Sequence, residues 1–359
     1  MNKKLVAVAM SVIMGAGILA GCGGSSSAGK SSGASSAAAS EAAGAASGST
    51  AAAASDGKTY ELKISTSQTE QAMITRSYQK LADELNEKSN GRLKVTVFPA
   101  GQLGGDEDVL EQAIQGVNVA VNTDASRCGQ YVKDFSILMM PYMFDNYDEC
   151  AKVTETDTFK GWVDELDKKQ GIKVLSFTFY DGPRHFMTNK EINSPDDLKG
   201  LRIRTIGQDV CTKAMSYMGA TPVSMSWGEV YNGIQSKALD GCEVQNTSCY
   251  PSRIYEVCKN QTKTGHFQLM QGLLCGSQWF NSLPEDLQEL LVTTAQEVGK
   301  ETAAEVESEC DKDEQEMVKA GLQVNTPDLQ PFKDAVQGEY DELGFTDLRA
   351  QLYKEIGKN

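Results

Sequence analysis

Hydrophobic and polar positions after residue 58 alternate in a way that predicts strands and helices in turn. Apolar side chains at every second position indicate short strands, and the stripe of Tyr78, Leu81 and Leu85 indicates a helix that ends at Gly91. The predicted elements of this series are strands over 62–65, 93–97 and 117–121 and helices over 70–89 and 104–114. This β-α-β-α-β order implies parallel strands with helices on the faces of the sheet.

A second series of the same kind begins after Gly171. Its predicted elements are strands over 172–180, 201–205, 222–225 and 239–244 and helices over 208–218 and 228–237. Two series separated near residue 181 predict an α/β protein with two lobes, and the length of the chain agrees. Pro284 begins a long acidic helix that we expect to reach about Lys319 and to stop at Gly321. Its apolar positions do not keep a heptad, which disfavours a coiled coil.

Polar residues follow the predicted strands. In parallel sheets, ligands bind beyond the carboxyl ends of the strands. The residues at these ends are Ser67, Asp124, Arg127, Arg184, Arg204, Trp227 and the turn at 244–246. Only eight of the 34 basic residues are arginine, so three or four arginines at strand ends exceed what scatter predicts.

One of these strands carries two arginines, in the stretch SPDDLKGLRIRT at 194–205. Ser194 and Asp197 suit a capped helical turn that Gly200 ends. The alternation then puts Arg202 and Arg204 on one face of the strand. On pattern alone, both side chains could lie on a solvated edge.

The first 57 residues predict an anchor and a tether. Lys3 and Lys4 precede a short apolar run that ends in LAGC, which resembles a bacterial lipobox with Cys22 as the lipidated residue. We therefore expect a signal peptide over 1–21 and a lipidated Gly/Ser/Ala tether over 22–57. This predicts an exported protein that is lipid-anchored to the outer face of the cytoplasmic membrane or faces the periplasm. An ordinary signal peptide that happens to contain a cysteine is the alternative.

Charge and missing motifs narrow the function. The formal net charge is −15, or −17 once Lys3 and Lys4 leave with the signal, which argues against a nucleic-acid partner. His185 and His266 are too far apart in sequence to suggest a metal pair, and the sequence has no nucleotide-binding, hydrolase or metalloprotease motif. We expect a binding protein that holds no metal and no cofactor and that is not an enzyme.

Eight cysteines follow Cys22, and an exported protein with so many often has a disulfide framework. These cysteines are scattered, however, without a C-x-x-C pair, in a chain large enough to fold without disulfides. We expect free, buried thiols at positions 128, 150, 211, 242, 249, 258, 275 and 310.

Four stretches resemble a known family: NEKSNGRLKVTVFPAGQLGGDEDVLEQAIQG, SPDDLKGLRIRT, MGATPVSMSWGEVYNGIQSKALDG and RIYEV. They are similar to the solute-binding proteins of TRAP (tripartite ATP-independent periplasmic) transporters of the DctP type, over 58–359. A binding protein for an ABC importer, whose fold is related, is an alternative, but the PAGQLGG and LKGLRIR stretches favour the TRAP family. A TRAP membrane permease is the implied partner, and a monomer is expected.

The resemblance implies a two-lobed, periplasmic-binding-protein-like fold with a hinge and a long helix that braces both lobes. It places 58–181 with 270–309 in lobe I and 182–269 with 310–359 in lobe II. The lobes are expected to close around one carboxylate-bearing solute. A binding protein that feeds a membrane sensor is the rival to transport.

The resemblance also assigns roles to site residues. Arg204 takes the ion pair with the ligand carboxylate, which leaves Arg202 as the solvated arginine. Arg184, in DGPR, matches a second family arginine, for which a surface loop is the alternative. Trp227 matches an aromatic position of the family's site, and the alternative is that this tryptophan simply packs in the core.

Asp124 and Arg127 match an acid and an arginine of sialic-acid-binding members. A helix cap formed by Asp124 with Arg127 as its partner is the alternative. Val244, in DGCEVQN, stands where many members have an asparagine that touches the ligand. Ser67 and Gln245 are further candidates, although polar residues at such turns often serve the backbone.

These residues suggest a ligand class. Arginine suits a carboxylate because its planar fork makes two charge-assisted hydrogen bonds. Asp124 in the same cleft would repel a second carboxylate and accept hydrogen bonds from hydroxyls. We therefore expect a small organic acid, with a uronate or other sugar acid first, and a C4-dicarboxylate, a keto acid or sialic acid as alternatives.

Overall fold

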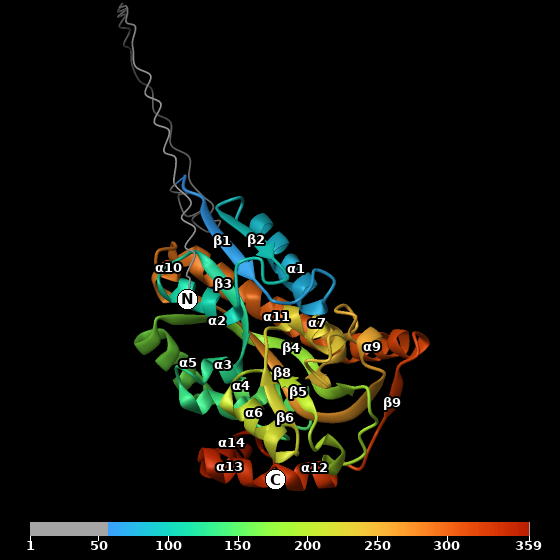
Figure 1. The fold of residues 1–359 in the computed structure, drawn as a ribbon. Coiled ribbons are helices and arrows are strands. Elements are labelled where there is room, and N and C mark those ends of the chain that lie inside the picture. The colour runs from blue at the N-terminus through green and yellow to red at the C-terminus, as the bar shows by residue number, and fades with distance from the viewer. Residues whose placement is uncertain (1–56, 359) are drawn as a thin grey trace, which may run out of the picture. The chain divides into compact units, whose positions relative to one another are not determined.

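A nine-stranded sheet runs through residues 57–358, the part of the chain that the structure, a computed structural model, describes (Figure 1). The strand order is β2-β1-β3-β8-β4-β7-β5-β6, with β9 on β8. The strands are β1 (Tyr60–Ser65), β2 (Leu93–Phe98), β3 (Val119–Asp124), β4 (Ile172–Thr188), β5 (Arg202–Thr205), β6 (Thr221–Ser224), β7 (Gly241–Val244), β8 (Asn260–Gly276) and β9 (Gln323–Asn325).

Helices cover both faces of this sheet. In chain order they are α1 (Met73–Lys88), α2 (Asp106–Ile114), α3 (Ala125–Cys128), η1 (Lys133–Met139), α4 (Tyr147–Thr154), α5 (Asp157–Gln170), η2 (Pro195–Leu198), α6 (Asp209–Tyr217), η3 (Trp227–Glu229), α7 (Val230–Gln235), α8 (Asn246–Cys249), α9 (Ile254–Val257), α10 (Ser277–Phe280), α11 (Glu285–Lys319), α12 (Gln330–Ala335), α13 (Gln337–Leu343) and α14 (Thr346–Ile356). The η elements are 3-10 helices.

The predicted parallel pairing is confirmed in two groups of strands. β1 pairs in parallel with β2 and β3, and β5 pairs in parallel with β6 and β7. We call β1–β3 with α1 and α2 the first α/β unit, and β5–β7 with α6 and α7 the second α/β unit. Alternation along β3 fixes its two faces, since Ala120 packs in the core beside α1 and α11 while Val119 and Val121 pack in the core beside α2.

Two long antiparallel strands join the units, and here the prediction was too short. A strand was expected to end at residue 180, but β4 continues to Thr188 alongside β8, and each of the two strands has 17 residues. Gly182 (φ 103°) and Pro183 do not end β4, because the pairing with β8 shifts register between Tyr180 and Pro183 and then resumes.

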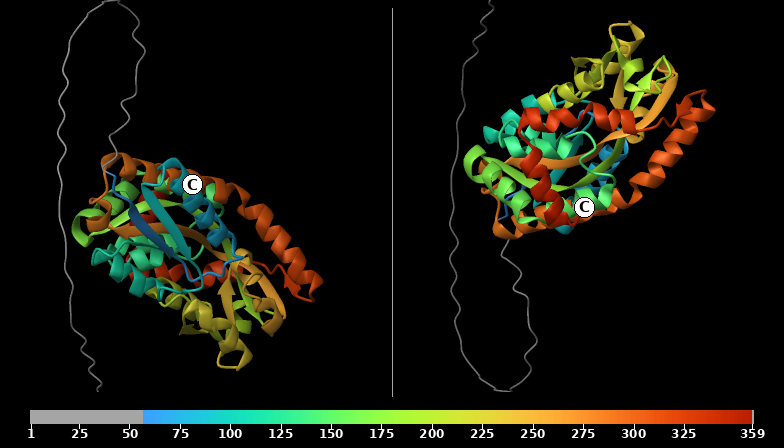
Figure 2. Two further views of the ribbon diagram at one scale, coloured as in Figure 1. Left: turned by 90° about the horizontal axis from the view of Figure 1, so that it is seen from above. Right: turned by 90° about the horizontal axis from the view of Figure 1, so that it is seen from below.

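The predicted long helix is confirmed as α11, which has 35 residues, follows Pro284 and is succeeded by Gly321 at φ 101°. α11 packs along β4 and α1 and also contacts α8 (Figure 2). Downstream, α12 contacts η2 and α13 contacts α6, while α14 contacts α4. α11 and the C-terminal helices therefore touch elements from widely separated parts of the chain.

The eight cysteines expected as free thiols are buried and form no disulfide. Cys22, the predicted signal segment 1–21 and the predicted tether up to residue 56 lie outside the described residues. Within residues 57–358, no helix has both the length and the apolar composition needed to cross a bilayer.

Glu339, in α13, is fully buried, and neither of its carboxyl oxygens has a hydrogen-bond partner. Burial raises its pKa to about 9; the nearby Lys213, which pairs with Glu342, opposes this shift, and the charge of Glu342 adds to it. The native state therefore holds this proton while the unfolded chain has lost it, so between pH 4.5 and about 9 the carboxyl makes the protein less stable as pH rises.

We expect Glu339→Gln to flatten this dependence and Glu339→Leu to stabilise the protein by about 1–3 kcal/mol at pH 8. Urea unfolding at pH 5.5 and 8.5 measures both effects. Asp334→Asn, which changes an exposed carboxylate in α12, is the control and should leave the pH dependence unchanged. An unchanged slope in Glu339→Gln would show that this carboxyl ionises freely in the folded protein.

Candidate functional site

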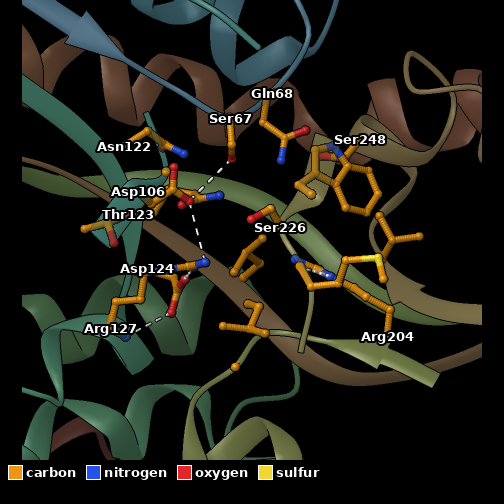
Figure 3. A pocket seen from close by; sticks show the side chains of 18 of the residues that line it. Ser67, Gln68, Asp106, Asn122, Thr123, Asp124, Arg127, Arg204, Ser226 and Ser248 are labelled. Carbon is orange, nitrogen blue, oxygen red and sulfur yellow. Dashed lines mark hydrogen bonds and ion pairs between the residues drawn. The ribbon is translucent and has the colours of Figure 1, made fainter. Parts of the chain in front are cut away.

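A polar cavity of about 300 Å³ lies beyond the carboxyl ends of strands from both α/β units (Figure 3). All eight residues expected to bind a ligand line this cavity. They are Ser67, Asp124, Arg127, Arg184, Arg204, Trp227, Val244 and Gln245. The strand-end rule therefore brought together side chains that are up to 178 positions apart in the sequence.

Arg204 is the cation of this cavity that has no carboxylate beside it. Its residue is 4% exposed, its Nε donates to the Met225 carbonyl at 2.9 Å, and its guanidinium carbon lies 5.5 Å from the centre of the Trp227 ring. No acceptor among residues 57–358 reaches its two terminal nitrogens. Burial lowers its pKa to about 10, and the nearby Arg184 adds to this, but it stays charged at neutral pH.

Arg202, two residues earlier, does not line the cavity. Its side chain is 43% exposed and pairs with Asp240 through Nε at 2.9 Å and Nη2 at 3.0 Å. The two arginines share a strand face as predicted, but they lie almost 7 Å apart along it. Arg204 therefore reaches the cavity at the carboxyl end of β5, while Arg202 stays at the amino end.

Arg184, unlike Arg204, is tied to the protein on several sides. Its Nε pairs with the fully buried Glu243, its Nη2 donates to the Glu243 carbonyl at 2.8 Å, and its Nη1 donates to Gln245 Oε1 at 2.7 Å. Burial acts to lower the pKa of Arg184, but the charge and hydrogen bond of Glu243 outweigh it and leave the pKa raised. Glu243 also accepts from Thr205 at 2.9 Å, so this ion pair connects β4, β5 and β7.

Asp124 is the N-cap of α3, with Arg127 as its ion-pair partner. Its Oδ1 accepts from Ser126 N at 2.9 Å and from Arg127 N at 3.3 Å. Burial alone would raise its pKa, but Arg127 and these hydrogen bonds leave it lowered. Asp124 is therefore a helix cap with Arg127 as its partner, which is the alternative given from the sequence. Most of its hydrogen-bonding capacity is used within the protein.

Three other predicted residues lie on the cavity in different ways. Ser67 donates to Asp106 at 3.4 Å, and Gln245 donates to Ser248 at 2.7 Å. Val244 is 1% exposed and also packs in the core of the second α/β unit. The neighbouring Asn246 instead donates to the Cys310 carbonyl in α11 at 3.2 Å, so it does not line the cavity.

Several lining residues were not predicted. Asp106 and Glu107 begin α2, where acids are common because they suit the helix dipole, so the sequence gives no sign that they line a cavity. Gln68, Thr123, Ser226 and Gln271 carry no sequence signal beyond their nearness to strand ends. Within the described part of the chain, no group of three or more His, Cys, Asp or Glu residues is placed to hold a metal ion.

A two-lobed α/β fold with a polar cavity between its strand ends is the fold of an extracytoplasmic solute-binding protein. Residues 64–347 match the family described as bacterial extracellular solute-binding protein, family 7 (DctP), and the chain belongs to this family. The predicted resemblance and the predicted fold class are thereby confirmed.

Two curated relatives support the assignment of the chain to this family. The chain is 30% identical over 294 residues, 81% of its length and 90% of the relative's, to the sialic acid-binding periplasmic protein SiaP of Vibrio cholerae. It is 29% identical over 246 residues, 68% of its length and 74% of the relative's, to the C4-dicarboxylate-binding periplasmic protein DctP of the same species.

Two solved structures bear on the conformation. A TRAP periplasmic solute-binding protein of Actinobacillus succinogenes with bound L-galactonate matches with a TM-score of 0.80 at 27% identity, covering 84% of this chain and 100% of that one. The open apo structure of such a protein from Escherichia fergusonii matches with 0.73 at 33% identity, covering 82% and 99%. The described conformation is thus more similar to the ligand-bound relative, although the open one is closer in sequence.

Val244→Asn tests the departure from the family pattern. The valine side chain is buried between the cavity and a core, so an amide there would lack partners, and we expect solute binding to weaken by about 1–3 kcal/mol. Calorimetric titration measures the effect. Val244→Ile, which keeps the apolar character, is the control. Unchanged affinity in Val244→Asn would mean that position 244 does not contribute to the binding surface.

Proposed function

We propose that the protein captures a small hydroxylated monocarboxylate, such as a sugar acid, and delivers it to the membrane permease of a TRAP transporter. The observation that carries the proposal is Arg204, a buried arginine that faces the cavity with free terminal N–H groups and no carboxylate partner. A ligand carboxylate would supply the missing counter-charge through two parallel hydrogen bonds.

The other residues of the site support this role in different ways. Trp227 holds the Arg204 guanidinium over its ring, and Ser226 and Gln271 add polar groups to the lining. Arg184 is restrained by Glu243 and can offer the ligand only its remaining donors. In this proposal the protein is not catalytic and works as a monomer.

Solved relatives support a sugar acid in particular. Their bound molecules include L-galactonate in the Actinobacillus succinogenes protein, L-fuconate in that of Ochrobacterium anthropi and D-glucuronate in that of Pseudomonas putida F1. Sialic acid and C4-dicarboxylates are the alternatives, because curated relatives are named for them.

Closure of the lobes completes the proposed capture. We place 58–181 and 270–309 in one lobe and 182–269 and 310–359 in the other, so that β4, β8 and α11 cross between them. Contacts of α6, in the second α/β unit, with α3 and η1, which follow β3 in the chain, join the two proposed lobes. Excluding water from the closed cavity strengthens the pair between Arg204 and the carboxylate.

A thermal-shift screen against organic acids tests the proposal. A bound solute at 100 times its Kd should stabilise the protein by about 2.7 kcal/mol, which gives a clear rise in Tm. We expect sugar acids to give this rise and neutral sugars of the same size to give none. A screen in which no carboxylate shifts Tm, or in which neutral sugars shift it equally, would overturn the proposal.

Anchoring through Cys22 is the remaining part of the proposal. Replacing Cys22 with serine should prevent lipidation and move the protein from the membrane fraction to the soluble extracytoplasmic fraction. Fractionation followed by immunoblotting measures this. Ser25→Ala, three residues beyond the lipobox, is the control and should leave the protein with the membrane. Membrane association that persists in Cys22→Ser would show that another feature anchors the chain.

A further inference from the structure

Two contacts orient the Arg204 guanidinium, and both come from one short connection between β6 and α7. The Met225 carbonyl accepts from Arg204 Nε at 2.9 Å, and the Trp227 ring faces the guanidinium, 5.5 Å from its central carbon. A two-pronged hydrogen bond to a carboxylate depends on the direction of the guanidinium plane as well as on its position. The placement of Met225 and Trp227 therefore affects how well Arg204 can meet a solute.

Packing alone does not fix this connection, which consists of residues 224–229. None of these residues is buried, the short helix η3 among them has no side-chain cap, and a methyl group added at Gly228 would meet no atom within 4 Å. Segments with few buried contacts are mobile unless polar contacts restrain them. The position of the connection therefore depends on hydrogen bonds to elements that are themselves held in place.

Ser252 accepts such a hydrogen bond from the connection. Trp227 Nε1 donates to Ser252 Oγ at 3.2 Å. Ser252 does not line the cavity; it lies in the turn between α8 and α9, where its backbone N–H donates to the Ser248 carbonyl at 3.1 Å. An oxygen outside the cavity thus restrains the ring that faces Arg204.

The turn that carries Ser252 is restrained by its neighbours. Arg253, the next residue, has a φ of 59°, a strained value for a residue with a side chain, which persists only where the surroundings impose it. Its Nε donates to Glu256 at 2.7 Å, and Tyr231 in α7 donates to the other carboxylate oxygen of Glu256 at 3.2 Å. The RIYEV stretch, which has no residue on the cavity, therefore ties the Ser252 turn to α7.

We propose that Ser252 is a positioning residue for solute capture: its hydroxyl oxygen holds the Trp227 indole so that Arg204 presents its terminal N–H groups to the carboxylate. The inference rests on the proposed function, because it concerns how Arg204 meets the carboxylate. Without this oxygen the indole N–H has only water as a partner, and the ring loses its fixed orientation. Arg204 then keeps its charge but has a freer guanidinium, so binding weakens without being lost.

Calorimetric titration of the purified protein with L-galactonate, L-fuconate and D-glucuronate tests this inference, with the acid that binds the wild type most tightly as the probe. Ser252→Ala should weaken binding of the probe roughly 3- to 10-fold, the range that one hydrogen bond contributes. Ser236→Ala, the same change at an exposed position after α7, is the control and should leave the affinity unchanged.

A double-mutant cycle with Trp227→Phe distinguishes positioning from a general effect on the fold. Phenylalanine keeps an aromatic face for Arg204 but has no N–H for Ser252. In the Trp227→Phe background, Ser252→Ala should therefore change the affinity less than about 2-fold. If Ser252 only supported the fold, its loss would weaken binding by the same factor with either aromatic residue at position 227.

Nuclear magnetic resonance of the indole N–H groups reports the contact itself without any solute. The chain has three tryptophans, of which Trp162 and Trp279 are buried in the hydrophobic cores. The signal that disappears in Trp227→Phe belongs to Trp227. In Ser252→Ala this signal should shift, because the indole loses its protein acceptor, while the other two signals stay in place.

The outcomes separate this inference from the proposed function. If none of the three acids binds the wild type, the proposed function fails, and the inference fails with it. If an acid binds the wild type and Ser252→Ala binds it equally tightly, the inference alone is overturned. The inference is also overturned if Ser252→Ala weakens binding equally with tryptophan and with phenylalanine at position 227, or if the Trp227 signal does not shift.

Discussion

Arg204→Ala is expected to abolish measurable solute binding while the protein still folds. The variant removes two charge-assisted hydrogen bonds to the ligand carboxylate, which corresponds to about 3–5 kcal/mol, or roughly a hundred- to several-thousand-fold in affinity. Arg204→Lys should recover only part of this loss, because an ammonium group cannot reproduce the planar fork. Calorimetric titration with the best solute from the screen measures both variants.

Folding and binding can be separated in this case. Arg204 is buried without a carboxylate partner, so its removal costs the empty protein little, and we expect the Tm without solute to be kept or raised. Arg202→Ala is the matched control, since Arg202 lies on the same strand but pairs with Asp240 and does not line the cavity. Wild-type affinity in Arg204→Ala would refute the assignment of the carboxylate site.

Glu243→Ala is expected to destabilise the fold by about 3–5 kcal/mol. The substitution leaves Arg184 buried without its ion-pair partner, and an uncompensated buried charge is far more costly than the pair itself is stabilising. The same change also removes the acceptor of the Thr205 hydroxyl. Urea unfolding measures the loss.

Two further variants show whether the loss of stability comes from the buried, unpaired charge of Arg184. The double variant Glu243→Leu with Arg184→Met should recover most of the lost stability, because it removes both charges. Asp240→Ala removes the partner of the half-exposed Arg202 and should cost no more than about 1 kcal/mol. If Glu243→Ala and Asp240→Ala cost the same, the buried pair has no special role in the fold.

The sequence predicted the elements whose limits are set by local chemistry. The helix from Pro284 to Gly321 was placed almost to the residue, because proline favours a helix start and glycine at positive φ a helix end. By contrast, β4 was cut short at residue 180, since Gly182 and Pro183 usually end a strand. Only pairing with β8, which is distant in the sequence, keeps β4 extended beyond them.

The site could be predicted only in part, because some of its contacts, like the length of β4, depend on strand pairing between distant parts of the sequence. The strand-end rule and the family resemblance together placed all eight expected residues on one cavity. They did not reveal that Arg184 is paired with Glu243, because the two residues are 59 positions apart and meet only through the pairing of β4 with β7. They also missed Asp106, because acids in a first helical turn are common for reasons unrelated to ligands.

The two long strands also bear on how the protein moves. β4 and β8 run through the middle of the sheet without interruption, and both shift register around Arg184, near Gly182 (φ 103°) and Gly265 (φ 54°). In the proposed capture, opening the cavity bends these continuous strands at their irregular points, with most of the ladder kept intact. On this proposal the molecule acts as an elastic flexure, and the stiffness of a few backbone positions, as well as the contacts with the solute, sets how quickly a captured solute is released.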